Sequence, residues 1–502
     1  MSDLAIVFSR AQNGIDAPLV RVEVHLSRGL PGLSIVGLPE TAVKESKDRV
    51  RAAILNSHLE FPKQRITINL SPADLPKEGG RFDLPIAIGI LAASKQVSAD
   101  RLGETEFIGE LSLGGDLHRI KGVLPVAIKT AEKNRVLVVP FENGVEAALI
   151  TTGVNKTANN LLEVCAWLNQ MDDLPNAIGQ KDVTLRPVAD LSEVKGQLQA
   201  KRALEIAAAG AHNLIFIGPP GTGKTMLATR MPGIMPPLTE KQALQTAAIA
   251  SISGNGFDIK DWFMPPFRQP HHTASAVALV GGGSNPQPGE ISLSHEGLLF
   301  LDELPEFSRH VLEVLRQPLE SGKITISRAA RQAEFPAKFQ LIAAMNPCPC
   351  GYLGDKERHC TCSQVQIERY RAKVSGPLVD RIDMHVEVSR IPHKELRIIS
   401  KSNETSQVVK TRVIDARNIQ LQRNSGKANA HLSNKEMEKL LNIPEKNLLL
   451  LEAIVEKLKL SARAYHRILK ISRTIADLDD SQIVAQKHLM EAISYRCLDR
   501  VM

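Results

Sequence analysis

The sequence predicts an α/β protein of two or three domains that ends in a helical segment. A chain of 502 residues is too long for a single hydrophobic core, so more than one domain is expected. Short apolar strands alternate with helical stretches over residues 1–180. Further along, an apolar strand, a glycine-rich turn and a helix follow one another over residues 213–230. This order is typical of a nucleotide-binding α/β domain.

The overall composition favours a soluble globular protein. Its hydrophobic content of 43% and charged content of 23% are ordinary for that class. Six cysteines in this length do not form a disulfide scaffold, and neither a signal peptide nor an apolar stretch long enough to span a membrane is evident. We therefore expect a cytoplasmic protein with no membrane partner. The formal charge of +7 resides in residues 391–502, which suits a nucleic-acid partner, although a solvated helical face explains it about as well.

Residues 1–170 are expected to form one α/β domain. Three segments alternate or cluster apolar residues like short strands, and two others have the pattern of helices, the second after a Gly-Gly turn. A polar, proline-containing linker is expected over residues 171–188. The predicted strands are 20–26, 66–70 and 136–140, and the predicted helices are 42–56 and 84–94.

The strongest motif is the glycine-rich turn after the apolar strand. Its glycines let the backbone curl so that N–H groups face a phosphate, and the following helix N-terminus adds partial positive charge. Lys224 can reach the β- and γ-phosphate oxygens, and the Thr225 hydroxyl can complete the shell of a Mg²⁺ ion. The pattern is too complete for a chance turn, so the sequence predicts a site for ATP and Mg²⁺. The predicted nucleotide-binding residues of this turn are Gly218, Pro219, Pro220, Gly221, Thr222, Gly223, Lys224 and Thr225.

Two further strands end in polar residues of the same kind of site. The buried strand 298–301 ends in Asp302 and Glu303. With the threonine of the glycine-rich turn available for the metal, Asp302 is expected to hold Mg²⁺ through water, and Glu303 to polarise the attacking water. The strand 339–345 ends at Asn346, which fits a sensor that orients this water. An asparagine that opens a turn before a proline is the plainer interpretation.

Several long strings make the chain similar to the YifB/ComM family of magnesium-chelatase-like AAA+ ATPases. They are FRQPHHTASAVALVGGG, PGEISLSHEGLLFLDELPEF, LIAAMNPCPCG and SGPLVDRID, and the resemblance runs nearly end to end. It implies an AAA+ core over residues 189–390 and a basic helical lid over residues 391–502. Residues 190–197 resemble the segment that packs near the adenine in such ATPases. The resemblance also implies a homo-oligomer, a hexameric ring, that binds DNA and hydrolyses ATP.

The N-terminal region carries a second resemblance. Residues 75–85 resemble the nucleophile segment of Lon-type protease domains, and residues 109–143 resemble the strand and helix that follow it. That family hydrolyses peptides with a serine activated by a lysine. The serine position falls at Arg81 and the lysine position at Leu124, so both chemical groups are absent. The resemblance therefore implies a Lon-like fold without protease activity.

Two arginines are expected to complete the ATPase site. The segment 375–383 resembles the arginine-finger segment of ring ATPases, so Arg381 would reach the γ-phosphate of a neighbouring subunit and stabilise transition-state charge. An ion pair within the chain, with Asp380 or Asp383, is the alternative. Arg463, at the start of a lid helix, resembles a second sensor that contacts phosphate.

Two insertions resemble the loops that line the central pore in the AAA+ clade of magnesium chelatase and minichromosome-maintenance helicases. Residues 267–283 look too irregular for a core helix and are expected to project as a loop, and residues 322–335 predict a hairpin with basic residues at its turn. Solvated charge is the plainer explanation of such residues. A metal at the two adjacent histidines is not expected, because neighbours point to different sides of an extended chain. The candidate DNA-binding residues are Arg268, His271, His272, Lys323, Arg328 and Arg331.

Two cysteine pairs, separated by a short loop, lie between Asn346 and Arg381. Such pairs can close around one tetrahedral Zn²⁺, with His359 as a substitute ligand. A single residue separates the members of each pair, fewer than usual, so reduced free thiols in a surface loop are an equal alternative. Cys165 and Cys497 are expected in the core. The candidate zinc ligands are Cys348, Cys350, Cys360 and Cys362.

The family resemblance also implies a function, that of an ATP-dependent DNA motor or helicase. Members found in competent bacteria drive branch migration while incoming single-stranded DNA is recombined into the chromosome during natural transformation. Single-stranded and branched or double-stranded DNA are therefore the expected partners. Two alternatives stay open: a magnesium-chelatase-like motor that serves metal insertion into a porphyrin, and a protein-remodelling ATPase. The Lon-like domain counts against the first, and the missing serine and lysine count against proteolysis.

Overall fold

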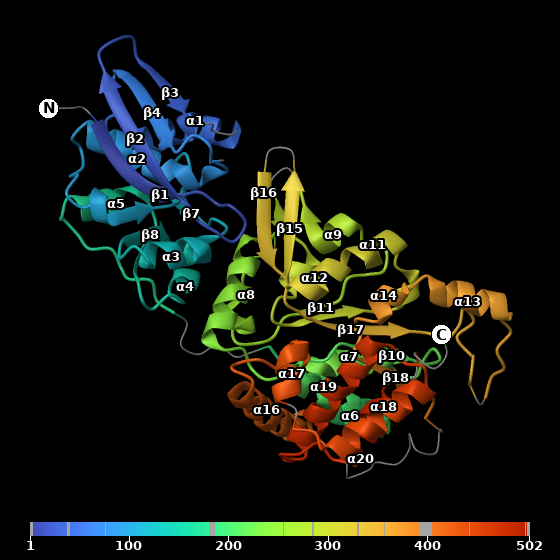
Figure 1. Ribbon diagram of the computed structural model, residues 1–502. Helices are drawn as coiled ribbons and strands as arrows, with labels where there is room; N and C mark the ends of the chain where they lie inside the picture. Colours follow the sequence, from blue (N-terminus) through green and yellow to red (C-terminus); the bar gives the residue numbers. More distant parts are fainter. Residues whose placement is uncertain are drawn as a thin grey trace.

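The computed structural model has three parts that follow one another along the chain (Figure 1). An N-terminal α/β domain leads into a core built on a parallel sheet, and a group of C-terminal helices packs against this core. The predicted α/β class with a helical C-terminal part is confirmed. The structure describes residues 4–37, 41–75, 77–179, 186–254, 256–283, 286–328, 331–355, 357–391, 404–440, 442–496 and 498, without the side chains of residues 41, 42, 44, 328 and 331.

The N-terminal domain is built on a mixed sheet of seven strands in the order β3-β4-β2-β1-β5-β8-β9. β2 pairs antiparallel with β1 and β4, and the other neighbours are parallel. Alternating burial along β2 confirms the predicted strand with one solvated face. Both predicted helices are present, and the second packs on β1 and β2. The elements are β1 (Leu4–Arg10), β2 (Leu19–Ser27), β3 (Gly32–Val36), α1 (Thr41–Asn56), β4 (Arg65–Ser71), α2 (Asp83–Ala93), β5 (Thr105–Phe107), β6 (Glu110–Leu111), β7 (Leu117–His118), α3 (Val123–Ala131), β8 (Val136–Pro140), α4 (Gly144–Ala147), β9 (Val154–Ala158) and α5 (Leu161–Leu168).

The chain stays on the N-terminal domain beyond residue 170. Leu174 is buried in the apolar core of this domain. The Ala177 N–H donates to the Asn155 carbonyl at 2.7 Å, so the backbone follows the edge of the sheet next to β9. The first half of the segment predicted as a linker, 171–188, is therefore anchored. Residues 180–185 of that segment lie outside the described residues.

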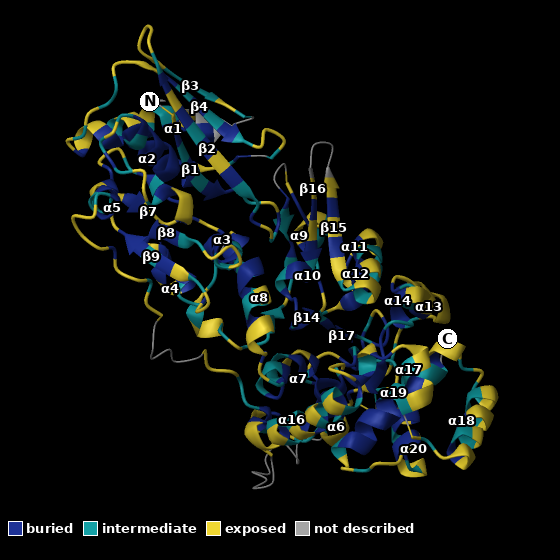
Figure 2. Ribbon diagram, turned by 60° about the vertical axis from the view of Figure 1, so that its left-hand side comes forward, coloured by how far each residue is buried: buried dark blue, intermediate teal, exposed yellow. Residues whose placement is uncertain are grey.

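The core sheet consists of five parallel strands in the order β11-β14-β17-β10-β18. Every residue of β10, β14 and β17 is buried, as expected for parallel strands covered on both faces (Figure 2). Alternate residues of β10 enter two different apolar clusters. Leu214 and Phe216 pack with α6 and the C-terminal helices, whereas Ile215 and Ile217 pack with the helices and the hairpin of the opposite face. The elements are α6 (Leu198–Gly210), β10 (Leu214–Ile217), β11 (Phe267–Arg268), β14 (Leu298–Leu301), α11 (Arg309–Val314), α12 (Arg316–Ser321), β17 (Gln340–Met345), α13 (Gln364–Ala372), α14 (Gly376–Val379) and β18 (Met384–Glu387).

The N-terminal domain contacts the core through α3, which packs on α8 (Glu240–Ile252). Leu124 of α3 shares an apolar cluster with Ala247 of α8. The Gly122 N–H donates to the Ser251 carbonyl at 3.0 Å, and the Ser251 hydroxyl bonds to the buried Glu146 carboxylate. Burial raises the pKa of Glu146, and the hydrogen bond from Ser251 works against this rise. Apolar packing and buried polar contacts therefore join the two parts.

A second contact involves the hairpin of β15 (Lys323–Arg328) and β16 (Arg331–Pro336). The hairpin projects from the core towards the N-terminal domain (Figure 1). A Cβ on Gly14, in the turn after β1, would lie 3.5 Å from Ala333 Cβ. Ile15 packs against the apolar cluster that includes the hairpin. The hairpin thus lies between the sheet and the N-terminal domain.

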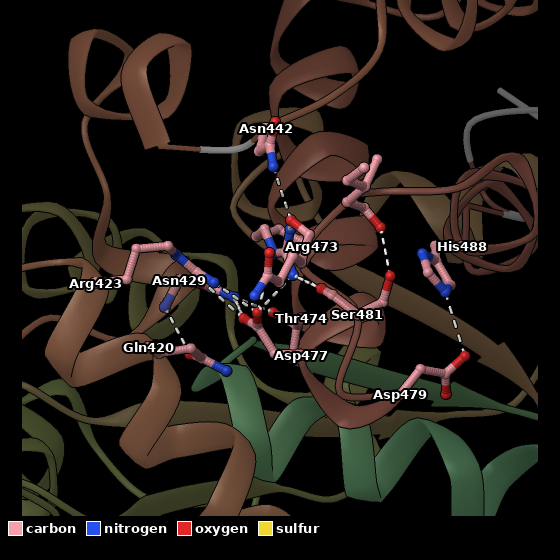
Figure 3. A network of polar contacts seen from close by, with 12 residues as sticks. Gln420, Arg423, Asn429, Asn442, Arg473, Thr474, Asp477, Asp479, Ser481 and His488 are labelled. Carbon is pink, nitrogen blue, oxygen red and sulfur yellow. Dashed lines mark hydrogen bonds and ion pairs between the residues drawn. The ribbon is translucent and has the colours of Figure 1, made fainter.

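A buried polar network joins the C-terminal helices (Figure 3). At its centre, Asp477 accepts hydrogen bonds from Arg423 at 2.6 and 2.9 Å and from Arg473 at 3.0 Å. Asn429 donates to the same carboxylate at 2.8 Å. A buried carboxylate is stable in this setting because two guanidinium groups and an amide surround it. The helices are α16 (Ser406–Arg423), α17 (Asn434–Leu440), α18 (Glu445–Lys457), α19 (Ala462–Leu478) and α20 (Gln486–Ser494).

Asp477→Ala is expected to lower the free energy of unfolding by about 3–5 kcal/mol, because it leaves two guanidinium groups in the network without their counter-charge. Urea titration of the full chain at constant pH measures the loss. Asp415→Ala, at an exposed position of α16, is the matched control and is expected to cost less than about 0.5 kcal/mol. Equal effects of the two substitutions would contradict the central place of Asp477 in the network.

Candidate nucleotide-binding site

The predicted phosphate-binding loop lies at the carboxyl end of β10 and leads into α7 (Lys224–Arg230). Gly221 and Gly223 have φ angles of +77° and +89°, in the left-handed region that a side chain would strain. Gly218 is required for a different reason, since a Cβ there would lie 2.1 Å from the Val388 carbonyl oxygen, just after β18. The glycine pattern of the sequence therefore follows from local backbone requirements of this loop.

Lys224 is folded over the loop. Its Nζ donates to the carbonyl oxygens of Gly218 and Pro219 at 2.7 and 2.9 Å and to Asn346 Oδ1 at 3.1 Å. Burial lowers the pKa of this amine to about 8, although the two carboxylates after β14 raise it. Within the described residues, no carboxylate forms an ion pair with Lys224. Phosphate oxygens would therefore be its first anionic contacts.

The two acids after β14 take different positions. The Thr225 hydroxyl donates to Asp302 Oδ2 at 2.6 Å, which places two oxygen ligands suited to Mg²⁺ side by side. Glu303 has a left-handed φ of +52°, and its Oε2 lies 3.3 Å from His272 Nδ1. Sequence reasoning missed this last contact, because the fold alone brings His272 to the acids and no spacing in the sequence indicates it.

A pocket of about 360 Å³ joins these groups. It is lined by the loop from Pro220 to Thr225, the two acids, Met345 and Asn346. Its walls supply an amine, hydroxyl groups, carboxylates and the N-terminus of α7, a donor set that fits the phosphates of MgATP. The carboxyl ends of β10, β14 and β17 meet here, which is where parallel α/β sheets bind their ligands.

Both predicted arginines lie outside the pocket of their own chain. Arg381 contacts the Glu320 carboxylate of α12. Arg463 is 65% exposed and lies 3.1 Å from Asp380 Oδ2. The alternative pairing of Arg381 with Asp380 or Asp383 is wrong, because Arg463 takes the first and the second is buried beside a different arginine. Neither arginine of one chain therefore reaches its own phosphate pocket in this structure.

Residues 267–283 are joined to the core at both ends, whereas most residues between β11 and Leu279 are half-buried or exposed. Phe267 and Arg268 form β11, the edge strand of the sheet, and Leu279 of α9 (Ala276–Val280) is fully buried. Arg268 donates to both carboxylate oxygens of Glu290 at 2.6 and 2.7 Å. The Arg268 guanidinium is thus paired with a carboxylate of its own chain, and the expectation that it contacts DNA stays a prediction.

The two adjacent histidines also depart from expectation. The rings of His271 and His272 lie next to each other, tilted by 33° with centroids 4.1 Å apart, whereas opposite directions were predicted. The chain turns here, with the Ala274 N–H donating to the His271 carbonyl at 2.9 Å, so the argument from an extended strand does not apply. Because His272 contacts Glu303, the pair lies beside the phosphate pocket, and its expected contact with DNA stays a prediction.

Residues 322–335 form the predicted hairpin. Arg328 and Arg331 are register partners beside its turn, and their side chains lie outside the described residues. Lys323 lies at the opposite end, where its Nζ is 2.9 Å from Glu334 Oε2. The prediction of Lys323 near the turn is wrong, because the paired strands extend from Lys323 to Pro336 and leave the turn far from their base.

The four candidate zinc ligands lie together, with all four sulfur atoms within 4.8 Å of one another. None of the four forms a disulfide; Cys348 is buried, and Cys350, Cys360 and Cys362 are half-buried. His359 is exposed and does not belong to the cluster. The arrangement is compatible with a zinc site. Cys165 is buried as predicted, and Cys497 lies outside the described residues.

The positions aligned with a Lon-type catalytic pair are occupied by other chemistry. Arg81 is 8% exposed and donates to Gln12 Oε1 and to the Lys121 carbonyl, both at 2.8 Å. Burial lowers the pKa of Arg81 to about 10. Leu124 is fully buried. The positions therefore hold no nucleophile and no amine base, and the likeness to Lon-type domains stays a prediction.

Comparisons with known proteins follow the same division of the chain. The family model "Magnesium chelatase, subunit ChlI" matches residues 190–396, "Subunit ChlI of Mg-chelatase" matches residues 22–143, and "Magnesium chelatase, subunit ChlI C-terminal" matches residues 403–496. Competence protein ComM of Haemophilus influenzae is 51% identical over 505 residues, which cover 99% of this chain and 98% of that protein. The chain belongs to the YifB/ComM magnesium-chelatase-like family.

Other relatives agree with this assignment. The protein YifB of Salmonella typhimurium is 48% identical over 499 residues, covering 99% of this chain and 98% of the relative. The magnesium-chelatase subunit ChlI of Pyropia yezoensis is 21% identical over 241 residues, 43% of this chain and 61% of that protein. Membership of the YifB/ComM family implies ATPase activity with ATP and Mg²⁺, and the family commonly forms oligomers. The parallel sheet and helical C-terminus fit its AAA+ fold. Among the described helices, none is both long and apolar enough to cross a bilayer.

The affinity for ATP is expected to fall as the pH rises through about 8, by at most about tenfold per pH unit, because Lys224 then loses the charge that phosphate requires. Binding restores the ammonium, so the protein takes up a proton above this pH. Calorimetry in two buffers of different ionisation enthalpy measures the proton uptake. Lys224→Arg keeps its charge at these pH values and is expected to lose the dependence. Unchanged proton uptake in Lys224→Arg would assign it to another group.

Proposed function

We propose that this YifB/ComM family member is an ATP-dependent DNA motor that works as a ring of identical subunits. The observation that carries the proposal is a phosphate pocket that no arginine of the described residues lines, with two arginines placed elsewhere on the same chain. A second subunit would supply the missing cation. A hexamer is the proposed ring, in keeping with the resemblance found in the sequence.

Each residue of the pocket has a proposed role. Lys224 holds the phosphate oxygens, and Thr225 with Asp302 holds Mg²⁺ through an arrangement that the 2.6 Å hydrogen bond already prepares. Glu303 polarises the attacking water, and Asn346, which contacts Lys224, orients it. Mg²⁺ held by Thr225 and Asp302 would supply positive charge that offsets the charge of the phosphates. Arg381 of the neighbour, with Arg463 as a second sensor, stabilises the developing charge.

The proposed division of the chain assigns one task to each part. Residues 1–170 form a Lon-like domain without proteolytic chemistry, 171–188 a linker whose first half is anchored on that domain, 189–390 the motor and 391–502 the basic lid. DNA contacts are proposed for the hairpin turn, which carries Arg328 and Arg331. The basic residues of the lid add to the positive field that attracts a polyanion.

The proposed biological role is branch migration during recombination of incoming DNA in natural transformation. Its support is the name of a relative, a competence protein 51% identical over nearly the whole length, together with the family resemblance in the sequence. Single-stranded and branched DNA are the proposed substrates, and the cytoplasm is the proposed location.

A magnesium-chelatase-like motor is the second candidate, because the matching family models all describe a magnesium chelatase subunit. Such a motor would act on a partner enzyme that inserts the metal, and DNA would not change its rate of ATP hydrolysis. A response of the ATPase rate to DNA therefore separates the two candidates.

Arg381→Ala and Lys224→Ala are each expected to abolish ATP hydrolysis, and a mixture of the two is expected to recover part of it. A mixed ring places an intact Arg381 beside an intact Lys224 at some subunit boundaries, whereas neither variant alone does so. Steady-state ATPase rates of the variants and of equimolar mixtures measure the recovery.

Arg369→Ala, at an exposed position of α13, is the matched arginine control and is expected to keep the full rate. If the mixture stays inactive although both variants assemble, Arg381 acts within its own chain or not at all, and the shared site is disproved.

Forked and single-stranded DNA are expected to raise the ATPase rate, and the double substitution Arg328→Ala/Arg331→Ala is expected to remove most of this increase, because phosphate contacts at the hairpin turn are lost. Lys323→Ala, at the base of the same hairpin, is the matched control and is expected to keep it. ATPase titrations with DNA at two salt concentrations measure both effects. A rate indifferent to DNA would favour the chelatase-like candidate.

A further inference from the structure

The cysteine cluster is a site with its own geometry, next to the phosphate pocket. Cys348 and Cys350 follow β17 and Asn346 directly, and Cys360 and Cys362 precede α13. Cys348 Sγ lies 3.3 Å from Cys350 Sγ and 3.6 Å from Cys360 Sγ. Cys350 Sγ and Cys360 Sγ are also 3.6 Å apart. The Cys350 N–H donates to Cys362 Sγ at 3.4 Å, which brings in the fourth ligand.

These distances suit four thiolates around one ion. A tetrahedral site with zinc–sulfur bonds of about 2.3 Å places its sulfur atoms about 3.8 Å apart, close to the separations observed. A disulfide requires about 2.05 Å, far shorter than any of them. A set of four sulfur ligands selects soft metals, and Zn²⁺ with four cysteines is the usual closed structural site.

The backbone explains how a single intervening residue can serve within each pair. The Gly351 N–H donates to the Cys348 carbonyl at 3.0 Å, which closes a tight turn over Cys350. Gly351 has a left-handed φ of +85°, and this conformation turns the chain back at once. Both sulfurs of the first pair therefore face the second pair, although the spacing is shorter than in most zinc sites.

The same turn touches the phosphate-binding loop. A Cβ on Gly351 would lie 2.7 Å from Pro220 Cδ and 3.9 Å from Asn346 Cγ. The cysteine turn is thus packed against the rim of the nucleotide pocket and beside the residue that contacts Lys224. Any shift of this turn would move Asn346 relative to the phosphates.

The loop between the two cysteine pairs also contacts the point where the chain leaves the sheet. Arg390, just after β18, lies 2.7 Å from Asp355 Oδ2 and above the ring of Tyr352 at 5.7 Å from its centroid. Ser389, beside it, accepts a hydrogen bond at 2.7 Å from Gln197, whose amide also reaches the Thr222 carbonyl. One loop therefore contacts the nucleotide pocket at one end and the chain that continues to the C-terminal helices at the other.

We propose that Cys348, Cys350, Cys360 and Cys362 bind one Zn²⁺ as thiolates and that this ion braces Asn346 against the phosphate-binding loop. Binding releases the four thiol protons, so that four thiolates and one Zn²⁺ carry a net negative charge. Arg390, which contacts Asp355 in the loop between the cysteine pairs, is a nearby positive charge. The metal site is independent of the proposed function, whereas the brace rests on the proposed role of Asn346 in ATP hydrolysis. Loss of the ion is expected to lower kcat for ATP hydrolysis about tenfold or more, with little change in ATP affinity, because the pocket stays formed while the sensor is displaced.

The metal is tested on the full chain, purified without a histidine tag, by elemental mass spectrometry, and one zinc per chain is expected. Titration of the native protein with an organomercurial in the presence of a chromogenic chelator is expected to release this zinc, which provides a measurement that needs no variant. Cys360→Ser/Cys362→Ser is expected to lose the metal. Cys165→Ala, which changes a buried cysteine of the N-terminal domain, is the matched control and is expected to keep it.

The same samples test the brace through kcat and the dissociation constant for ATP. Protein without metal, or zinc replaced by iron as purified, would overturn the zinc site and leave the proposed function untouched. Zinc release with kcat unchanged would overturn the brace. A chain that holds zinc yet hydrolyses no ATP would refute the proposed function and the brace together, while the metal site stands.

Discussion

The burial of a parallel sheet on both faces is the constraint on which the rest of the structure depends. Parallel strands such as β10, β14 and β17 cannot present one face to water, so the chain must supply two covering layers. The C-terminal helices cover one face through the cluster around Phe216, and the hairpin with its neighbouring helices covers the other through Ile215. The phosphate pocket lies at the carboxyl edge, between these two covering layers. The site is therefore a consequence of how the sheet is enclosed.

The opposite edge of the sheet carries the polar contacts that hold the C-terminal helices in place. His212, just before β10, bonds to the Thr474 hydroxyl of α19 at 2.8 Å. Asp383, just before β18, contacts Arg467 of the same helix and accepts a hydrogen bond from the Asn213 N–H at 2.8 Å. Burial by itself would raise the pKa of Asp383, but Arg467 and His212 keep it well below its usual range. The helices are thus fixed at one edge of the sheet, while nucleotide contacts form at the other.

The sequence predicted well those features that depend only on the local backbone conformation. The left-handed glycines of the phosphate-binding loop, the fully apolar strands and the acids at a strand end each follow from the conformation of a few neighbouring residues. The partners of charged side chains could not be predicted in this way. Arg268 finds Glu290 and His272 finds Glu303 only because the sheet brings separate segments together. Lys323 was misplaced because composition does not indicate where a hairpin turns. The cysteine cluster is intermediate between these two groups. The sequence showed the four candidate ligands but left open whether their sulfur atoms lie together.

The left-handed backbone of Glu303 sets stability against the presence of a carboxylate at this position. A residue other than glycine at φ +52° costs of order 1 kcal/mol, and a long side chain offers no local compensation of the kind that asparagine provides. Most random replacements at this position are expected to be neutral at best for folding, but glycine would relieve the strain. With the role proposed for Glu303, a more stable chain would be a less active one at this position, because relief of the strain by glycine also removes the carboxylate.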